Sequence, residues 1–417
     1  MLTYLKRGVW ILLIALVFWL GILPHLLLST SSLAEVPEKG VLQHFVEDYQ
    51  TSKERFELYP SILKEYWDSV QLESKPIGQQ DLAVEFIEAK ANKKKENLLI
   101  LTSGIHGIEG FTGSAMLDYV TNSFAPQLNA DNTGLVMVHA VNPWGMKHER
   151  RFNEHNVDLN RNFIYDWDTF DTSINKEYPK VEGLLESNQP VGNLGVYEAS
   201  FLGSLVNNAA REGIGTIEDA LLTGQYTNEE GVYFGGKADE PSTAVLKQLY
   251  KKWLGSGYEQ IIHIDLHTGY GPRYEMSIFS SPQETMTELE AEEAFQYSNV
   301  LTPASEGFYV TKGDNTDYIN VLKEEAYPNV DLYSTTFEFG TLGDGTMASI
   351  QSLKRTVTEN RMFHNGVTNV TAKETIENQY KSMFYPHEEK WRTTAIQDFQ
   401  KALTGVLHFK DIIDSEE

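Results

Sequence analysis

The sequence contains no cysteine. Disulfide bonds, thiolate zinc sites and cysteine nucleophiles are therefore excluded, which leaves histidine, aspartate and glutamate as possible metal ligands. Basic residues are also scarce, with 34 Lys and Arg against 59 Asp and Glu and a net charge of −25. Nucleic-acid binding needs a basic surface, so we expect no nucleic-acid partner. The chain also lacks internal repeats and long polar linkers, and its 41% apolar content is typical of a globular protein.

Charged residues are absent from a stretch near the amino terminus. Lys6 and Arg7 precede the tract from Val9 to Leu23, which carries no charged side chain. Ser32-Leu33-Ala34 offers the small residues typical of signal cleavage, although about 20 apolar residues would also span a bilayer. We expect residues 1–34 to be either a signal peptide or a membrane anchor, so that the protein is exported or held at the cell surface.

Strand and helix patterns alternate through the rest of the chain. Leu98–Leu101 and Ile261–Leu266 are apolar runs typical of strands covered on both faces, whereas Leu82–Glu88 alternates like a half-buried strand. Phe111–Val120 has helical spacing, and the lysine-rich segment Ala91–Glu96 is typical of a solvated hairpin turn. These patterns predict an α/β fold in which a mixed, mostly parallel sheet carries helices on both faces.

We expect one catalytic domain over residues 35–417, with an insertion at about 163–260 and a helical tail at about 350–417. Trp391 and Phe399 are the expected packing residues of this tail. The segments that carry chemistry follow predicted strands, and ligands of open α/β sheets bind beyond the carboxyl ends of strands. The sequence therefore predicts that these distant segments meet at one site.

Candidate metal ligands occur at three positions. His106 and Glu109 lie three apart in a glycine-rich turn, and His267 follows an apolar strand. Two imidazoles and one carboxylate suit a catalytic zinc site, which uses three protein ligands. His263 is a competing choice, because residues four apart on a strand point to the same side. We choose His267 because it lies past the predicted strand end, and we interpret His263 as structural.

Several motifs together resemble the zinc carboxypeptidases of the carboxypeptidase A type. They are His106-x-x-Glu109, Asn142-Pro143-x-Gly145, Arg151-x-Asn153, Val157-Asp158-Leu159-Asn160-Arg161-Asn162-Phe163, His267 and Glu338. The resemblance covers roughly Leu98 to Leu342. It implies a single zinc ion and the same mixed α/β fold.

The resemblance also implies a role for each matching residue. His106, Glu109 and His267 would hold the zinc ion, and Asp158 would orient a ligating histidine. Arg151 would polarise the scissile carbonyl, Asn160 and Arg161 would bind the terminal carboxylate of the substrate, and Glu338 would be the general base. A tyrosine that caps the substrate in this family matches Tyr309, with Tyr318 as the rival. Arg150 is interpreted as a surface salt-bridge residue.

The insertion departs from the digestive members of this family. Gly224-Gln225-Tyr226 and Tyr233-Phe234-Gly235-Gly236 resemble an uncharacterised bacterial branch, and the insertion could either reshape or cover the cleft or be only a structural elaboration of its rim. The leading hypothesis is an exported zinc metallocarboxypeptidase acting on a peptide with a free carboxylate. The alternatives are a zinc amidohydrolase that deacylates N-acyl amino acids and a non-catalytic zinc-binding or peptide-binding surface domain.

Overall fold

The computed structural model describes residues 40–78, 82–186, 189–305 and 311–414. The expected signal peptide or anchor, at residues 1–34, lies outside these ranges. Across the ranges themselves, no helix is both long and apolar enough to cross a bilayer. Residues 40–417 cluster as one compact unit, separate from the first 39.

The described residues form an eight-stranded sheet with the order β1-β2-β4-β3-β5-β8-β6-β7. The strands are β1 Ser69–Pro76, β2 Ala83–Lys90, β3 Asn97–Ser103, β4 Thr133–Val138, β5 Gln260–Gly269, β6 Met276–Ser280, β7 Val300–Leu301 and β8 Asp331–Gly340. The central strands β4, β3, β5 and β8 run parallel, whereas β1, β2 and β6 join by antiparallel pairing. The predicted mixed, mostly parallel sheet is confirmed.

The register of the central strands brings the predicted site residues together. His267 on β5 pairs with Glu338 on β8, and Asp265 pairs with Thr102 on β3 and with Thr336 on β8. Both His267 and Glu338 lie within their strands rather than past the strand ends, because β5 runs to Gly269 and β8 to Gly340.

The expected hairpin at Ala91–Glu96 is wrong. β2 and β3 are not neighbours, because β4 lies between them and pairs with both. The connecting segment crosses the start of β4, where Asn92 donates its backbone N–H to Ala130 and Lys93 donates to Asp131. A polar turn in the sequence does not show which later strand will insert between its two flanks.

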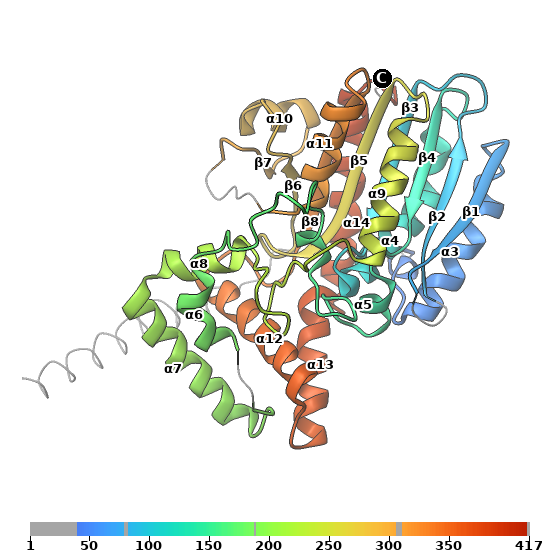
Figure 1. Cartoon of the computed structure of the whole chain (residues 1–417). Helices are drawn as coiled ribbons and strands as arrows, with labels where there is room; N and C mark the ends of the chain where they lie inside the picture. The colour runs from blue at the N-terminus through green and yellow to red at the C-terminus, as the bar shows by residue number, and fades with distance from the viewer. Residues whose placement is uncertain (1–39, 79–81, 187–188, 306–310, 415–417) are drawn as a thin grey trace, which may run out of the picture. The chain divides into compact units, whose positions relative to one another are not determined.

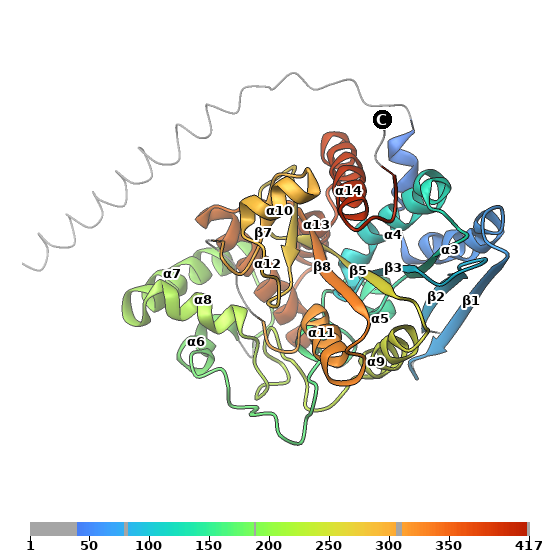
Figure 2. The same ribbon diagram turned by 90° about the horizontal axis from the view of Figure 1, so that it is seen from above.

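Helices cover both faces of the sheet (Figures 1 and 2). Their bounds are α3 Tyr49–Leu63, α4 Gly110–Tyr119, α5 Pro143–Lys147, α6 Tyr178–Leu185, α7 Leu194–Glu212, α8 Ile214–Leu222, α9 Pro241–Leu254, α10 Glu288–Phe295, α11 Asn315–Ala326, α12 Thr346–Asn365, α13 Val370–Phe384 and α14 Glu389–Phe409. In Figure 2, α3, α4 and α14 lie along one face, and α9 and α11 lie along the other. All ten residues of α4 are buried.

The inserted segment divides between two hydrophobic cores. Helix α9 packs into the main core through Leu246, Tyr250 and Trp253. Helices α6, α7 and α8 instead form a second, smaller core with Leu353 and Val357 of α12. Figure 1 shows these three green helices beside α12 in orange. The insertion is therefore a structural addition that stands next to the sheet and is joined to the C-terminal helices.

The C-terminal tail is helical as expected, and its packing residues are buried. Phe399 on α14 is fully buried and packs against Tyr119, Phe337 and Phe339. It thus joins α14 to α4 and to β8, the strand that carries Glu338.

We predict that Phe399→Ala lowers the free energy of unfolding by about 3–5 kcal/mol, because the truncation leaves a cavity in the main core. Urea denaturation of the two proteins would measure this change. Phe409→Ala is the matched control, since Phe409 lies on the same helix but is 41% exposed. Equal losses for the two variants would contradict the central position assigned to Phe399.

Candidate metal centre

His106, Glu109 and His267 are placed by two strand ends. His106 follows β3 and precedes a short 3-10 helix, Gly107–Glu109, while His267 lies near the end of β5. The turn after His106 packs tightly on α5, where a Cβ atom at Gly107 would collide with the backbone of Gly145. Glycine at this position therefore allows the turn to bring His106 and Glu109 toward β5.

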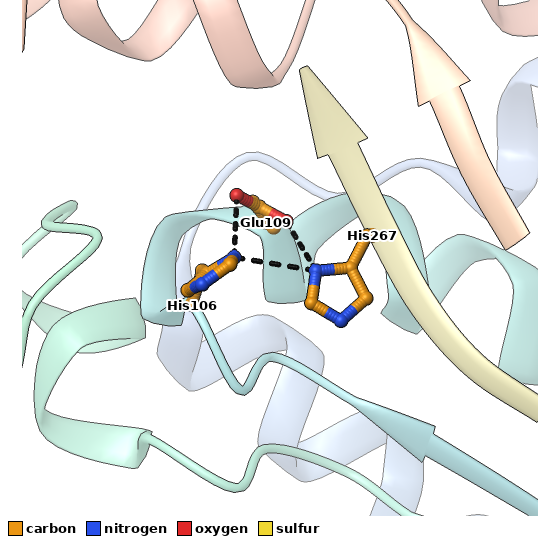
Figure 3. A group of neighbouring side chains, drawn as sticks. All are labelled: His106, Glu109 and His267. Atoms are coloured by element: carbon orange, nitrogen blue, oxygen red, sulfur yellow. Dashed lines mark hydrogen bonds and ion pairs between the residues drawn. The ribbon is translucent and has the colours of Figure 1, made fainter. Parts of the chain in front are cut away.

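The three side chains point toward one another (Figure 3). His106 Nδ1 lies 3.0 Å from a Glu109 oxygen and 3.2 Å from His267 Nδ1. His267 Nδ1 lies 3.3 Å from the second Glu109 oxygen. All three residues are buried, with 2–4% exposure. The structure thus brings together the three predicted ligands from segments that are far apart in the sequence.

These distances fit a tetrahedral zinc ion. Ligands about 2.0–2.1 Å from such an ion lie roughly 3.3 Å from one another. The observed separations of 3.0–3.3 Å, in which each histidine faces a different oxygen of Glu109, are close to that value. The donor types also fit, because two imidazoles and one carboxylate occur in catalytic zinc sites. His106, Glu109 and His267 could therefore hold the implied ion.

A buried carboxylate contacts the Nε2 atom of each imidazole, on the side of the ring away from the donor cluster. Nε2 of His106 lies 3.0 Å from Asp158, and Nε2 of His267 lies 2.9 Å from Asp265. Donation of the Nε2 proton to each carboxylate leaves Nδ1 with a free lone pair for a cation. The predicted position of Asp158 beside a ligand histidine fits this arrangement. The equivalent position of Asp265 was missed, although Asp265 stands two residues before His267.

Asp265 is itself fixed by neighbouring strands and helices. It accepts hydrogen bonds from Thr102 Oγ1 at 2.6 Å and from the Asn315 side chain at 3.0 Å. His263 binds Thr102, Tyr250 and Ser334 inside the sheet, where burial lowers the pKa of this imidazole to about 4. These contacts bear out the structural interpretation of His263.

Arg151 lies against the same group of residues. Its guanidinium donates to Asp158 at 3.1 Å and to Glu109 at 3.2 Å, and its Nη2 is 2.7 Å from Nε2 of His106. Nε2 of His106 cannot donate to Asp158 and accept from Arg151 at the same time. With a cation on Nδ1, the form that donates to Asp158 is the one that fits.

Negative charge exceeds positive charge at the donor cluster. Burial alone would raise the pKa of Glu109, but His106, His267 and Arg151 outweigh it and hold that pKa well below its usual range. Burial and the charge of Glu109 raise the pKa of Glu338 to about 7. Glu338 accepts a hydrogen bond from the backbone N–H of Tyr270 at 2.9 Å. A divalent cation would offset this concentration of buried carboxylates.

A cavity of about 550 Å³ opens beside the donor cluster. Its lining includes Arg151, Arg161, Glu338 and residues from β5, β8, α8, α11 and α12. The contribution from α8 means that the insertion forms part of the cavity wall. Of the two expected possibilities, the structure thus shows that the insertion shapes the cleft.

Arg161 is the least satisfied buried cation in this cavity. The residue is 6% exposed and donates from Nη1 to the Asn160 carbonyl, whereas its Nε atom has no hydrogen-bond partner. Asn160 is engaged on both sides, because its amide donates to Asp314 and accepts from the Asn315 backbone N–H. Arg161 is thus the more available of the two residues for an incoming anion.

The candidate tyrosines need revision. Tyr309 lies outside the described residues. Tyr318 packs among Phe163, Tyr165 and Tyr250 and is absent from the cavity lining, so the structure does not place it toward a substrate. Tyr233 and Tyr270 line the cavity instead, and both were missed. Tyr270 stands three residues after His267, and this proximity is the one feature of the sequence that could have indicated its place in the cavity.

Arg150 is not a surface residue. It is 4% exposed and its Nε lies 2.6 Å from Glu359 on α12, while its guanidinium stacks over Phe363. The expectation of a salt bridge is confirmed, but its expected position at the surface is wrong. The partner is 209 residues away, so no local pattern reveals it.

We predict that the wild-type protein binds one zinc ion and that His267→Ala abolishes stoichiometric binding. Asp265→Asn should weaken the affinity about 10–100-fold, because it replaces the charged carboxylate that orients His267 with a neutral amide. Metal analysis after dialysis against a chelator would measure both effects. His155→Ala is the control, since His155 is a half-exposed histidine that pairs with Glu240. Retention of full zinc content by His267→Ala would contradict the assigned ligand set.

Comparisons with known proteins give one family and several similar structures. The chain is similar to bovine thrombin-activatable fibrinolysis inhibitor in complex with tick carboxypeptidase inhibitor, at 14% identity and a TM-score of 0.42, covering 76% of this chain and 96% of that one. It is similar to carboxypeptidase A from Helicoverpa armigera, at 13% identity and a TM-score of 0.41, covering 82% and 75%. A murein-tripeptide amidase from Escherichia coli O157 gives 18% identity and a TM-score of 0.34, covering 72% and 95%.

No curated protein matches the sequence. A family model matches residues 45–398, which is most of the chain and includes every described residue of the metal centre. The chain therefore belongs to the family described as "Protein of unknown function (DUF2817)".

Proposed function

We propose that this protein is a zinc-dependent hydrolase that cleaves an amide bond next to a free carboxylate, and that it acts as a metallocarboxypeptidase. One observation carries the proposal. The three-residue donor cluster, Glu338 and Arg161 line a single cavity, and the buried Nε of Arg161 has no hydrogen-bond partner. A binding module would have no need of a proton acceptor beside its metal site.

Each residue has a distinct task in this reaction. When bound, zinc supplies Lewis acidity, which makes water more acidic and a carbonyl carbon more electrophilic. Glu338 accepts the proton of the attacking water and later delivers it to the leaving amine. Arg151 stabilises the oxyanion that develops on the carbonyl; loss of such a donor typically costs about 10²–10³ in turnover. Its pairing with Asp158 and Glu109 fixes its position beside the donor cluster.

The free carboxylate of the substrate is assigned to Arg161. A guanidinium offers a planar pair of N–H groups that can bind both oxygens of a carboxylate. The unpartnered Nε is one of these donors, and it belongs to a residue that lines the cavity. Its burial strengthens the interaction, because charges attract more strongly away from water.

We predict that Glu338→Gln lowers kcat by about 10²–10⁴-fold, since glutamine cannot accept the proton. Its zinc content should match the wild type, because Glu338 is not a donor in the cluster. Hydrolysis assays paired with metal analysis would measure both quantities. Glu325→Gln, an exposed change on α11, is the control for altered charge. Turnover that survives in Glu338→Gln would refute the proposed mechanism.

We also predict that Arg161→Lys raises KM by about tenfold or more for peptides with a free carboxyl end, because lysine loses the paired donors. Peptides with an amidated carboxyl end should be poor substrates for the wild type and should change little in the variant. Steady-state kinetics on matched free and amidated peptides would test this. Equal hydrolysis of the two peptides by the wild type would argue against carboxylate recognition.

N-acyl amino acids form the alternative substrate class, since they also carry an amide next to a free carboxylate. Efficient hydrolysis of N-acyl amino acids without hydrolysis of peptides would favour the amidohydrolase over the carboxypeptidase. We further propose export, on the basis of Lys6, Arg7 and the uncharged tract that follows them. Recovery of the protein only from the cytosolic fraction of producing cells would refute it.

A further inference from the structure

Two carboxylates from separate elements line the cavity on the side of Tyr270. Glu218 lies on α8 of the insertion, and Asp344 lies in the loop between β8 and α12. Both line the cavity and both are exposed. Both also act electrostatically on the phenol of Tyr270, whose backbone N–H holds Glu338. Both carboxylates therefore lie near Tyr270, the residue that holds the proposed general base.

These carboxylates lack cationic neighbours. Among the described residues, neither Glu218 nor Asp344 makes an ion pair or hydrogen bond, and no lysine lines the cavity. Of the two arginines there, Arg151 is already paired with Asp158 and Glu109. A positive charge on a ligand would thus meet two unpaired acceptors on the side of Tyr270.

Arg161 contributes a positive charge to the lining of the same cavity. It lies against Gly224, just beyond the end of α8, and it bonds to Asn160 beside the start of α11. Arg161 also lines the cavity, and its buried Nε has no hydrogen-bond partner. The cavity therefore offers Arg161 to an anion and the two carboxylates to a cation.

The spacing of these charged groups suits a short peptide. From Glu218 to Leu222 the helix rises roughly 6 Å, and Gly224 lies two residues further along the chain. An extended dipeptide or tripeptide spans roughly 7–10 Å. A free amino group on such a peptide would reach Glu218 and Asp344 while the carboxylate binds Arg161.

Resting on the proposed function, we propose that Glu218 and Asp344 select substrates with a cationic group on the acyl side of the scissile bond. The substrate class is a short peptide with a free amino group. The same carboxylates discriminate against dicarboxylic acyl groups such as succinyl, because like charges repel. This selectivity favours a peptidase over an enzyme that removes anionic acyl groups.

A chain with a net charge of −25 also carries exposed carboxylates that have no role at the site. The test therefore needs a control carboxylate outside the cavity, and Asp219 is that control. It follows Glu218 on α8 and is exposed, but it does not line the cavity. A substitution there changes the net charge of the same helix equally, and only the position relative to the cavity differs.

The test uses one tripeptide in three forms, with a free, an acetylated or a succinylated amino group. For the zinc-loaded wild type we expect kcat/KM to be at least about tenfold higher for the free form than for the succinylated form at low salt. The ratio should fall as ionic strength rises. In the double variant Glu218→Gln with Asp344→Asn, the ratio of kcat/KM for the free form to that for the succinylated form should fall to about threefold or less. Asp219→Asn should preserve the wild-type ratio.

Binding of the same three peptides to Glu338→Gln, measured by calorimetry, gives a second readout that needs no turnover. The inference is overturned if the double variant keeps the wild-type ratio, or if the succinylated form is preferred. Equal cleavage of all three forms would overturn it while leaving the proposed function intact. Failure of the zinc-loaded wild type to cleave any form, or any N-acyl amino acid, would overturn both.

Discussion

The pairing of each imidazole with a buried carboxylate is the interaction on which the site depends. Asp158 and Asp265 hold the Nε2 atoms of His106 and His267, so both Nδ1 lone pairs can face the same point as Glu109. Without these acceptors the rings could turn or change tautomer, and the donor atoms would not converge. Asp265 in turn is held by Thr102 and Asn315, which join the site to β3 and α11.

The parallel sheet sets the distances between the remaining groups. Adjacent β5 and β8 place His267 directly opposite Glu338, which fixes the proposed base beside the donor cluster. Helices α6, α7 and α8 of the insertion play a different part, because they pack in a core of their own with α12. His267 and Glu338 thus stand on the sheet, while part of the cavity wall comes from α8, which packs outside the main core. This division agrees with a site whose chemistry and selectivity have separate structural origins.

Individual elements show which features the local sequence predicts and which it does not. The apolar run at Leu98–Leu101 and the helical spacing at Phe111–Val120 predicted β3 and α4, because burial imposes a periodicity that local sequence records. The local sequence at Ala91–Glu96 indicates a hairpin turn, but the insertion of β4 between its flanks depends on a strand that comes later. Nothing near Arg150 in the sequence indicates its burial, because its partner Glu359 lies on a distant helix.

The sequence by itself pointed to the three candidate donor residues through residue types and the resemblance to known motifs, and it determined the α/β class and the exclusion of cysteine chemistry through short-range patterns and composition. Only the tertiary structure decided that Asp265 supports His267, that Arg161 keeps an unpartnered donor, and that Glu218 of α8 and Asp344 line the same cavity. The reason is physical: hydrogen-bond partners and burial depend on which segments pack together. That packing reflects the free energy of the whole chain, which no short stretch of residues encodes.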